Sequence, residues 1–203
     1  VENLGWRSLF KIKEVCYVEL VNVFYSNFTM VHGNYGQLIL SSDIKGKTIT
    51  FGPNKGVEIL NIPNQGLTTF EEKKWLTRSD GFSVKECLRM IYLDGENIHS
   101  NMELRTNKLN IHLRLLHHII ALHMLPTGGG YARMSRMEGF LMWCIITERQ
   151  YKIPSLIMHI MLRTSQRSYA ILPYGIILMK IFWHFKALLE GECGTPLNRN
   201  DNI

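Results

Sequence analysis

The chain has 203 residues, of which 46% are hydrophobic and 20% charged, proportions that exclude a disordered tail and suit one domain of ordinary size. The formal net charge is +6, which points to an anionic partner without proving one. The cysteines lie far apart with no C-x-x-C spacing, which argues against a zinc site and fits reduced thiols inside a cell.

The first third of the chain predicts one helix, one hairpin and a short second helix. An apolar stripe at i, i+3, i+4 and i+7 predicts a helix over residues 13–26. Two β-prone runs joined by residues 41–47 predict a β-hairpin near residues 37–51, the only strand signal in the sequence. Pro53 then begins a short helix that ends at Ile62.

From residue 69 onward the chain carries repeated helix-start signals. Four segments match the capping box, in which a hydroxyl and a carboxylate satisfy free N–H groups, and these are Thr69–Glu72, Ser83–Glu86, Ser100–Glu103 and Ser135–Glu138. The pattern predicts helices near residues 70–78, 84–92, 102–124, 136–149, 154–167 and 174–187.

The fold class follows from these elements. We expect a mainly α (α+β) protein, with a single helical domain of about seven or eight helices over residues 1–190 and a polar C-terminal tail over residues 191–203. The chain starts at Val1 rather than Met and shows no secretory signal, so we expect an intracellular segment of a longer product, with the nucleus as one candidate compartment. The longest uncharged apolar stretch, residues 168–179, is too short to cross a membrane, so no membrane partner is expected.

One predicted helix is rich in histidine, and these residues are His112, His117, His118 and His123. Ligands on one helix face need i, i+3 or i+4 spacing, whereas steps of five residues turn about 140° round the helix. H-E-x-x-H is absent, and no acidic residue lies within the stretch. We therefore predict no metal site and interpret the histidines mainly as ordinary helix residues.

The sequence carries no recognisable catalytic arrangement. G-x-S-x-G is absent, and carboxylates are sparse in the helical half, where Glu138 already serves as a capping residue. Metal-dependent nucleases and polymerases need clustered acids at strand ends, which this chain does not offer. We expect no enzyme activity, no cofactor, no catalytic residue and no small-molecule substrate.

Positive charge is concentrated in the second half of the chain. Residues 105–180 hold ten basic residues against Glu138 and Glu148. Lysine and arginine side chains can contact phosphates without reading sequence, so DNA or RNA is the predicted partner. The candidate nucleic-acid-binding residues are Arg105, Lys108, Arg114, Arg133, Arg136, Arg149, Lys152, Arg163 and Arg167.

A glycine run between two predicted helices is the best candidate for an anion-binding loop. Gly128, Gly129 and Gly130 precede a helix whose first turns carry Arg133 and Arg136, and exposed N–H groups beside arginines can hold a phosphate. Neither G-x-x-x-x-G-K-[ST] nor G-x-G-x-x-G is present, so a flexible connector is the commoner interpretation.

Aromatic and methionine side chains gather in the predicted helices 136–149 and 174–187. The preferred interpretation is a hydrophobic core. Because both segments are apolar nearly all round, an apolar face for a partner helix or for self-association is the alternative.

Several short blocks occur in a recognisable order. They are VFYSN at 23–27, KGKTITFGP at 45–53, ILNIPNQG at 59–66, RLLHHIIA at 114–121, LPTGG at 125–129 and LPYG at 172–175. In this order and spacing the chain resembles the putative plant transposon protein domain, a family found beside or inside retroelement-derived reading frames. The resemblance covers about residues 15–187.

The resemblance implies a mobile-element origin and carries over no catalytic residue, cofactor or site. The chain departs from the family pattern at Gly56, where members usually place a helix former, and fits it loosely over residues 31–44. The first hypothesis is a non-catalytic retroelement-derived domain that binds nucleic acid non-specifically through a basic helical surface. The alternatives are a protein-interaction or self-assembly module of an element-encoded polyprotein, or a decayed copy with no function.

Overall fold

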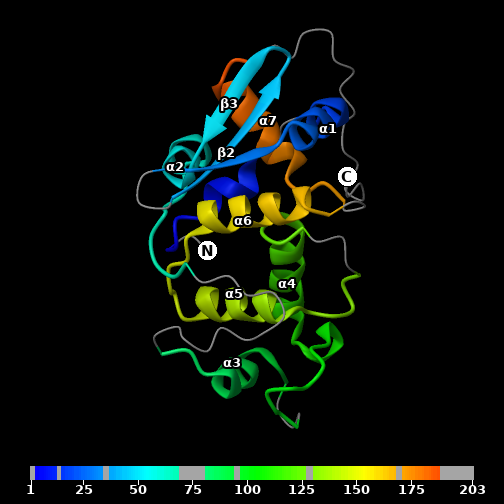
Figure 1. The fold of residues 1–203 in the computed structure, drawn as a ribbon. Coiled ribbons are helices and arrows are strands. Elements are labelled where there is room, and N and C mark those ends of the chain that lie inside the picture. The colour runs from blue at the N-terminus through cyan, green and yellow to red at the C-terminus, as the bar shows by residue number, and fades with distance from the viewer. Residues whose placement is uncertain are drawn as a thin grey trace. The chain divides into compact units, whose positions relative to one another are not determined.

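The computed structural model describes residues 3–12, 15–33, 37–68, 81–93, 97–126, 130–167 and 171–187. Within these ranges the chain forms seven α-helices, short 3-10 helices and a three-stranded antiparallel sheet (Figure 1). The prediction of a mainly α protein with a small amount of β structure is confirmed.

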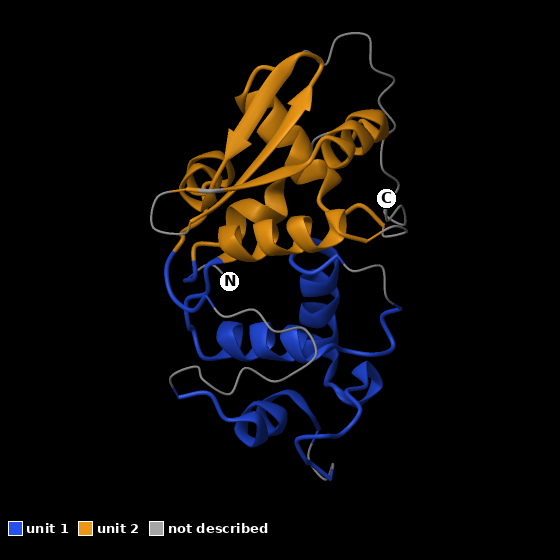
Figure 2. Cartoon of the chain, viewed as in Figure 1, with its two compact units in different colours: residues 1–4, 65–152 blue, residues 5–64, 153–203 orange. Residues whose placement is uncertain are grey.

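The chain divides into two compact units (Figure 2). Unit 1 comprises residues 1–4 and 65–152, and unit 2 comprises residues 5–64 and 153–203. The long segment of unit 1, residues 65–152, therefore lies in the sequence between the two parts of unit 2, and residues 1–4 precede both. The expectation of a single domain over residues 1–190 stays a prediction.

Unit 2 contains the sheet together with four α-helices among its described residues. Its elements are η1 (Arg7–Lys11), α1 (Val18–Ser26), β1 (Thr29–His32), β2 (Leu38–Ile44), β3 (Lys47–Phe51), α2 (Pro53–Leu60), α6 (Ile153–Ser165) and α7 (Gly175–His184). Helix α1 packs against β2 and α7, while α2 packs against β3, α6 and α7. The two sequence segments of unit 2 thus share one core.

Strands β2 and β3 form the predicted hairpin, with Lys45 and Gly46 as its turn. Both residues have positive φ, 48° and 76°, as the favoured two-residue hairpin turns require. The expected connector over residues 41–47 is wrong, because β2 continues as a strand to Ile44. The buried hydroxyl of Ser42 donates to the carbonyl of Phe24 at 2.9 Å, so a polar residue fits inside this strand.

Strand β1 was not predicted, because the sequence indicated only a single hairpin. It pairs antiparallel with β2, from Thr29 opposite Ser41 to His32 opposite Leu38. Its Met30 and Val31 are both exposed. An alternating pattern arises when one face of a strand is buried, and β1 lacks that pattern because neighbouring side chains both face solvent.

The core of unit 2 is built around Phe24 of α1. Its ring stacks on that of Phe51 at 6.4 Å between centroids and lies 5.9 Å from that of Phe182. The hydroxyl of the neighbouring Tyr25 donates to the carbonyl of Pro173 at 3.0 Å. Aromatic side chains from both sequence segments of unit 2 therefore meet at α1.

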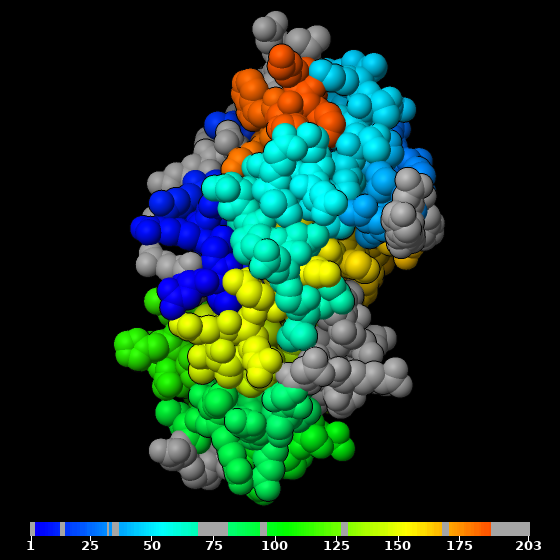
Figure 3. Space-filling model, turned by 90° about the vertical axis from the view of Figure 1, so that its left-hand side faces the viewer, coloured from blue at the N-terminus to red at the C-terminus, as the bar shows by residue number. Residues whose placement is uncertain are grey.

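Gly56 sits where α2 passes closest to α6. A Cβ atom at this position would lie 3.2 Å from Cβ of Pro154, so a side chain here would push the two helices apart. Figure 3 shows the segment after α2 beside the N-terminal segment, where Gly5 lies against Pro63. Glycine at position 56 thus allows α2 to lie close to Pro154 of α6, despite its low helix propensity.

Unit 1 contains the other described helices. They are α3 (Val84–Ile91), η3 (Thr106–Lys108), α4 (Ile111–His123) and α5 (Arg136–Ile146). Helix α5 packs against both α3 and α4. Predicted helices near 84–92 and 136–149 are therefore present, with α5 ending three residues earlier than expected.

Two of the predicted capping boxes do begin helices of unit 1. At α5 the box is complete, because Oγ of Ser135 accepts from the N–H of Glu138 at 3.2 Å and the Glu138 carboxylate accepts from the N–H of Ser135 at 2.5 Å. At α3, Oγ of Ser83 accepts from the N–H of Glu86 at 3.4 Å. Both starts follow from the sequence pattern.

The predicted helix over residues 102–124 is wrong in its first half. Helix α4 begins at Ile111, where Oδ1 of Asn110 accepts from the N–H of Leu113 at 2.9 Å. Before it the chain forms the bridge at Arg105 and the short 3-10 helix η3, and the N–H of Met134 donates to the carbonyl of Leu104. Backbone pairing across unit 1 therefore overrides the Ser100–Glu103 capping pattern.

Helices α5 and α7 serve mainly as core. Eight residues of α5 and six of α7 are buried. Ile146 of α5 and Trp183 of α7 are the large apolar side chains that stay exposed in these two helices, at 39% and 57%. The preferred interpretation of both segments as core is supported, while Trp183 gives α7 one exposed aromatic side chain.

Other predicted elements fall outside the described residues, namely the helix near 70–78 and the polar tail over 191–203. Helix α1 begins at Val18 rather than residue 13, and residues 13–14 also lie outside the described part. Across the described ranges, no helix combines the length and the apolar character that crossing a bilayer requires.

Candidate nucleic-acid interface

The nine candidate basic residues are divided between the two units. Unit 1 holds Arg105, Lys108, Arg114, Arg133, Arg136, Arg149 and Lys152, whereas unit 2 holds Arg163 and Arg167. The contiguous stretch of charge in the sequence is therefore carried by two separate bodies. We describe the unit 1 residues first, because several of them converge there.

Arg105 and Arg133 are direct partners in an antiparallel backbone bridge. Two backbone hydrogen bonds flank the bridge. The N–H of Thr106 donates to the carbonyl of Ala132, and the N–H of Met134 donates to the carbonyl of Leu104. Residues opposite each other in such a pair have Cα atoms about 5 Å apart and present their side chains to the same face. Two arginines 28 positions apart in the sequence thus lie side by side.

Glu103 holds this arginine pair together. Its Oε2 lies 2.7 Å from Nη2 of Arg105, and its Oε1 lies 2.9 Å from Nε of Arg133. A hydrogen bond from Arg105 and the charges of both arginines lower the pKa of the Glu103 carboxyl below its ordinary value. This exposed carboxylate offsets part of the positive charge that residues 105–180 carry.

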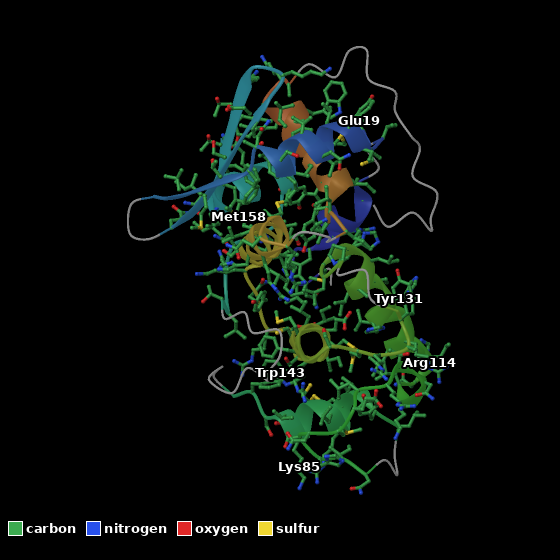
Figure 4. The ribbon with its side chains drawn as sticks, turned by 45° about the vertical axis from the view of Figure 1, so that its right-hand side comes forward. Glu19, Lys85, Arg114, Tyr131, Trp143 and Met158 are labelled. Carbon is green, nitrogen blue, oxygen red and sulfur yellow. The ribbon has the colours of Figure 1, made fainter. Side chains whose placement is uncertain are left out.

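Arg114 is fixed by backbone carbonyls rather than by an acid. Its Nε donates to the carbonyl of Leu109 and its Nη2 to that of Asn107, both at 2.9 Å. Figure 4 shows Arg114 and Tyr131 along the same side of α4. We call the set Arg105, Lys108, Arg114 and Arg133 the basic edge of unit 1. With Glu103 included, its formal charge is +3.

The other candidates are more dispersed. Arg136 is the first residue of α5 and is half-buried, while the guanidinium of Arg149 lies 5.9 Å over the ring of Trp143. Lys152 is half-buried at the end of unit 1. In unit 2, burial and the nearby charge of Arg167 lower the pKa of Arg163.

The predicted anion-binding loop is described only at its end. Gly128 and Gly129 lie outside the described residues, and Gly130 is exposed with open space around its α-carbon. The anion site at this loop therefore stays a prediction.

A buried polar pair joins α4 to α5 inside unit 1. His117 and Glu138 are 2% and 7% exposed, and Nε2 of His117 lies 3.6 Å from Oε1 of Glu138. The Nε2 atom of His117 is buried and has no hydrogen-bond partner. The burial of the His117 side chain could have been predicted, because His117, Ile120 and Met124 lie on one face of the helix and all three are buried.

The cysteine thiols in the described part are shielded from solvent. Cys16, Cys87 and Cys144 are buried free thiols. Burial raises the pKa of Cys16 to about 11 and that of Cys87 to about 12, so neither forms the nucleophilic thiolate at neutral pH. Within the described ranges, no three His, Cys, Asp or Glu side chains gather as ligands for a metal ion.

These features define a mainly helical, two-unit protein with a small antiparallel sheet and a cluster of arginines in one unit. The chain belongs to the putative plant retrotransposon-related domain family, whose model matches residues 2–187. The family resemblance predicted from the sequence blocks is thereby confirmed. No curated protein and no solved structure matches the chain.

Proposed function

We propose that this retrotransposon-related domain is non-catalytic and binds the phosphate backbone of DNA or RNA through the basic edge of unit 1. The observation that supports the proposal is the backbone bridge between Arg105 and Arg133, which brings two distant arginines onto one face. Arg114 and Lys108 follow within nine positions of Arg105 and add two further charges.

The geometry favours phosphate contact over sequence readout. Arg105 and Arg133 are exposed and lie on two irregular segments. Recognition of base edges normally needs a helix or a β-ribbon that enters a groove of the nucleic acid, and these segments form neither. Cations at such an edge release counterions from nucleic acid, which gives affinity that falls as salt rises. We therefore expect weak, salt-dependent binding without sequence preference.

The test is a fluorescence anisotropy titration of the whole chain with labelled DNA and RNA at several salt concentrations. The double variant Arg105→Gln/Arg133→Gln is compared with Lys85→Gln/Arg89→Gln, which removes the same charge from exposed positions of α3 in the same unit. Each lost phosphate contact lowers the slope of log affinity against log salt by about 0.9 on duplex DNA.

The expected result is weaker binding and a shallower slope for the Arg105→Gln/Arg133→Gln variant, with a smaller change for the α3 variant. Absence of wild-type binding at low salt overturns the proposal, as does wild-type binding that salt does not weaken. Equal losses in the two variants would mean that overall charge, rather than the basic edge, attracts the nucleic acid.

A second candidate function is protein association through α7. Trp183 is 57% exposed, and a tryptophan at this exposure is a typical anchor of a protein contact. Light scattering of wild type and Trp183→Gln at high concentration tests it. A concentration-dependent increase in mass that the substitution removes supports association, whereas a monomer at every concentration excludes self-assembly.

A further inference from the structure

Unit 1 has an open groove of about 480 Å³ along the exposed side of α4. The lining side chains that matter here are Ile111, His112, Arg114, Leu115, His118 and Tyr131. The groove adjoins the basic edge, because it shares Arg114 with that edge and is also lined by Thr106, the residue after Arg105.

The lining combines apolar area with aromatic rings. Ile111 and Leu115, one helical turn apart, are 68% and 62% exposed, and Tyr131 is 38% exposed. The rings of Tyr131 and His118 lie 4.5 Å apart at 56°. So much apolar surface in solvent at one place is a common mark of a binding site.

The polar part of the lining is basic or neutral. None of the lining residues is acidic, and Arg114 holds a fixed position through the carbonyls of Leu109 and Asn107. The hydroxyl of Thr106 donates to the carbonyl of Tyr131 at 2.8 Å, which ties Tyr131 to the segment that carries Arg105. An occupant of this groove therefore meets rings and aliphatic surface with positive charge at the border.

We infer that the groove holds an unpaired base of a single-stranded nucleic acid whose phosphates lie on the basic edge. This inference rests on the proposed function and names the form of nucleic acid that the site prefers. Single-strand sites combine cations along the backbone path with aromatic rings on which bases stack, and both features are present here on adjoining residues. A duplex keeps its bases paired and stacked, so it can use only the cations.

An acidic amphipathic peptide would also match an apolar groove with a basic border. Two observations favour a base. The groove offers the rings of His112, His118 and Tyr131 beside a guanidinium, and stacking on rings and guanidinium planes is how unpaired bases are held. Arg105 of the basic edge is exposed and directly precedes Thr106 of the groove lining, so a phosphate next to the bound base would meet a cation at the border of the groove.

The experiment measures binding of the whole chain to a labelled twelve-nucleotide oligo(dT) and to a hairpin duplex of equal phosphate number. Tyr131→Ala is compared with Ile171→Ala, which shortens an exposed apolar side chain of unit 2. Leu115→Gln is a second groove variant, and matched far-UV spectra and unfolding midpoints show that each variant folds.

We expect Tyr131→Ala and Leu115→Gln each to weaken oligo(dT) binding roughly tenfold, with duplex binding unchanged in both variants and oligo(dT) binding unchanged in Ile171→Ala. Equal effects on oligo(dT) and duplex, or no effect on either, overturn the groove assignment and leave the proposed function standing. Failure of wild type to bind either probe overturns both. Binding of an acidic amphipathic peptide that Tyr131→Ala abolishes, without oligo(dT) binding, assigns the groove to a protein instead.

Discussion

Nε2 of His117 lies 3.6 Å from Oε1 of Glu138, and this contact joins α4 to α5 inside unit 1. The other carboxylate oxygen of Glu138 accepts the N–H of Ser135 and completes the cap of α5. One side chain therefore both starts a helix and faces a buried histidine. Removing it should disturb both the cap and the interface between the two helices.

Glu138→Ala is expected to destabilise the protein by about 2–4 kcal/mol, because it removes the cap and leaves His117 without its buried partner. Glu138→Gln keeps an oxygen for the Ser135 N–H and should cost less. Ser135→Ala removes only the cap and should cost about 1 kcal/mol. Urea unfolding measures all three, and equal losses for Ala and Gln at position 138 would show that the cap oxygen does not matter.

Gly66→Ala is expected to destabilise unit 1 strongly. Gly66 has φ +92°, and a Cβ atom there would clash with the backbone carbonyl of Gln150. The segments at Gly66 and Gln150 cannot move apart without breaking the hydrogen bond from the Leu67 N–H to that carbonyl. The substitution should therefore lower the free energy of unfolding by at least about 2 kcal/mol.

Gly46→Ala provides the matched control for that substitution. Gly46 has φ +76° in the hairpin turn, and no neighbouring atom lies within 4 Å of the place that a Cβ atom would occupy. Gly46→Ala should lower the free energy of unfolding by about 1 kcal/mol, which is the penalty of placing alanine in the left-handed conformation. Similar unfolding free energies for the two variants would contradict the clash at Gly66.

Glu103→Gln is expected to strengthen nucleic-acid binding roughly three- to tenfold at 0.1 M salt, because it frees Arg105 and Arg133 for phosphates. The pKa of Glu103 is lowered, so its carboxylate is charged at every pH above the ordinary value of 4.5. The gain should therefore be the same at pH 5.5 and pH 8. Glu58→Gln makes the same charge change in unit 2 and should have a smaller effect; an equal gain would argue against the basic edge.

Stability is expected to fall at alkaline pH because of the buried thiols. The folded pKa of Cys16 is about 11 and that of Cys87 about 12, against an ordinary value of 9.0. A raised folded pKa contributes stability below pH 9.0 that is lost as pH rises through the folded value. Urea midpoints between pH 8 and pH 11 should fall less steeply for Cys16→Ala and for Cys87→Ala; parallel curves would contradict the assignment.

Much of the helical part was predictable because its signals are local. Ser135 with Glu138 and Ser83 with Glu86 mark helix starts within four residues, and the structure has helices at both places. The hairpin was predicted from its two β-prone runs, although its turn is Lys45 and Gly46 rather than the whole of residues 41–47. These patterns work because the interacting groups are close in sequence.

The candidate site was only partly predictable, because its geometry depends on long-range pairing. Arg105 and Arg133 were both identified as candidates, yet nothing local shows that a backbone bridge sets them side by side. The same pairing explains why Ser100 and Glu103 do not start a helix. Glu103 joins the two arginines instead, which no spacing rule would reveal.

The bridge between Leu67 and Tyr151 pairs the beginning and the end of the long segment of unit 1, residues 65–152. During translation, residues 5–64 are synthesised before α6 and α7. At about 5–20 residues per second, synthesis of the intervening residues 65–152 takes several seconds. During that delay Phe24 of α1 lacks the ring of Phe182 on which it packs, so the core of unit 2 is completed only after α7 has been made.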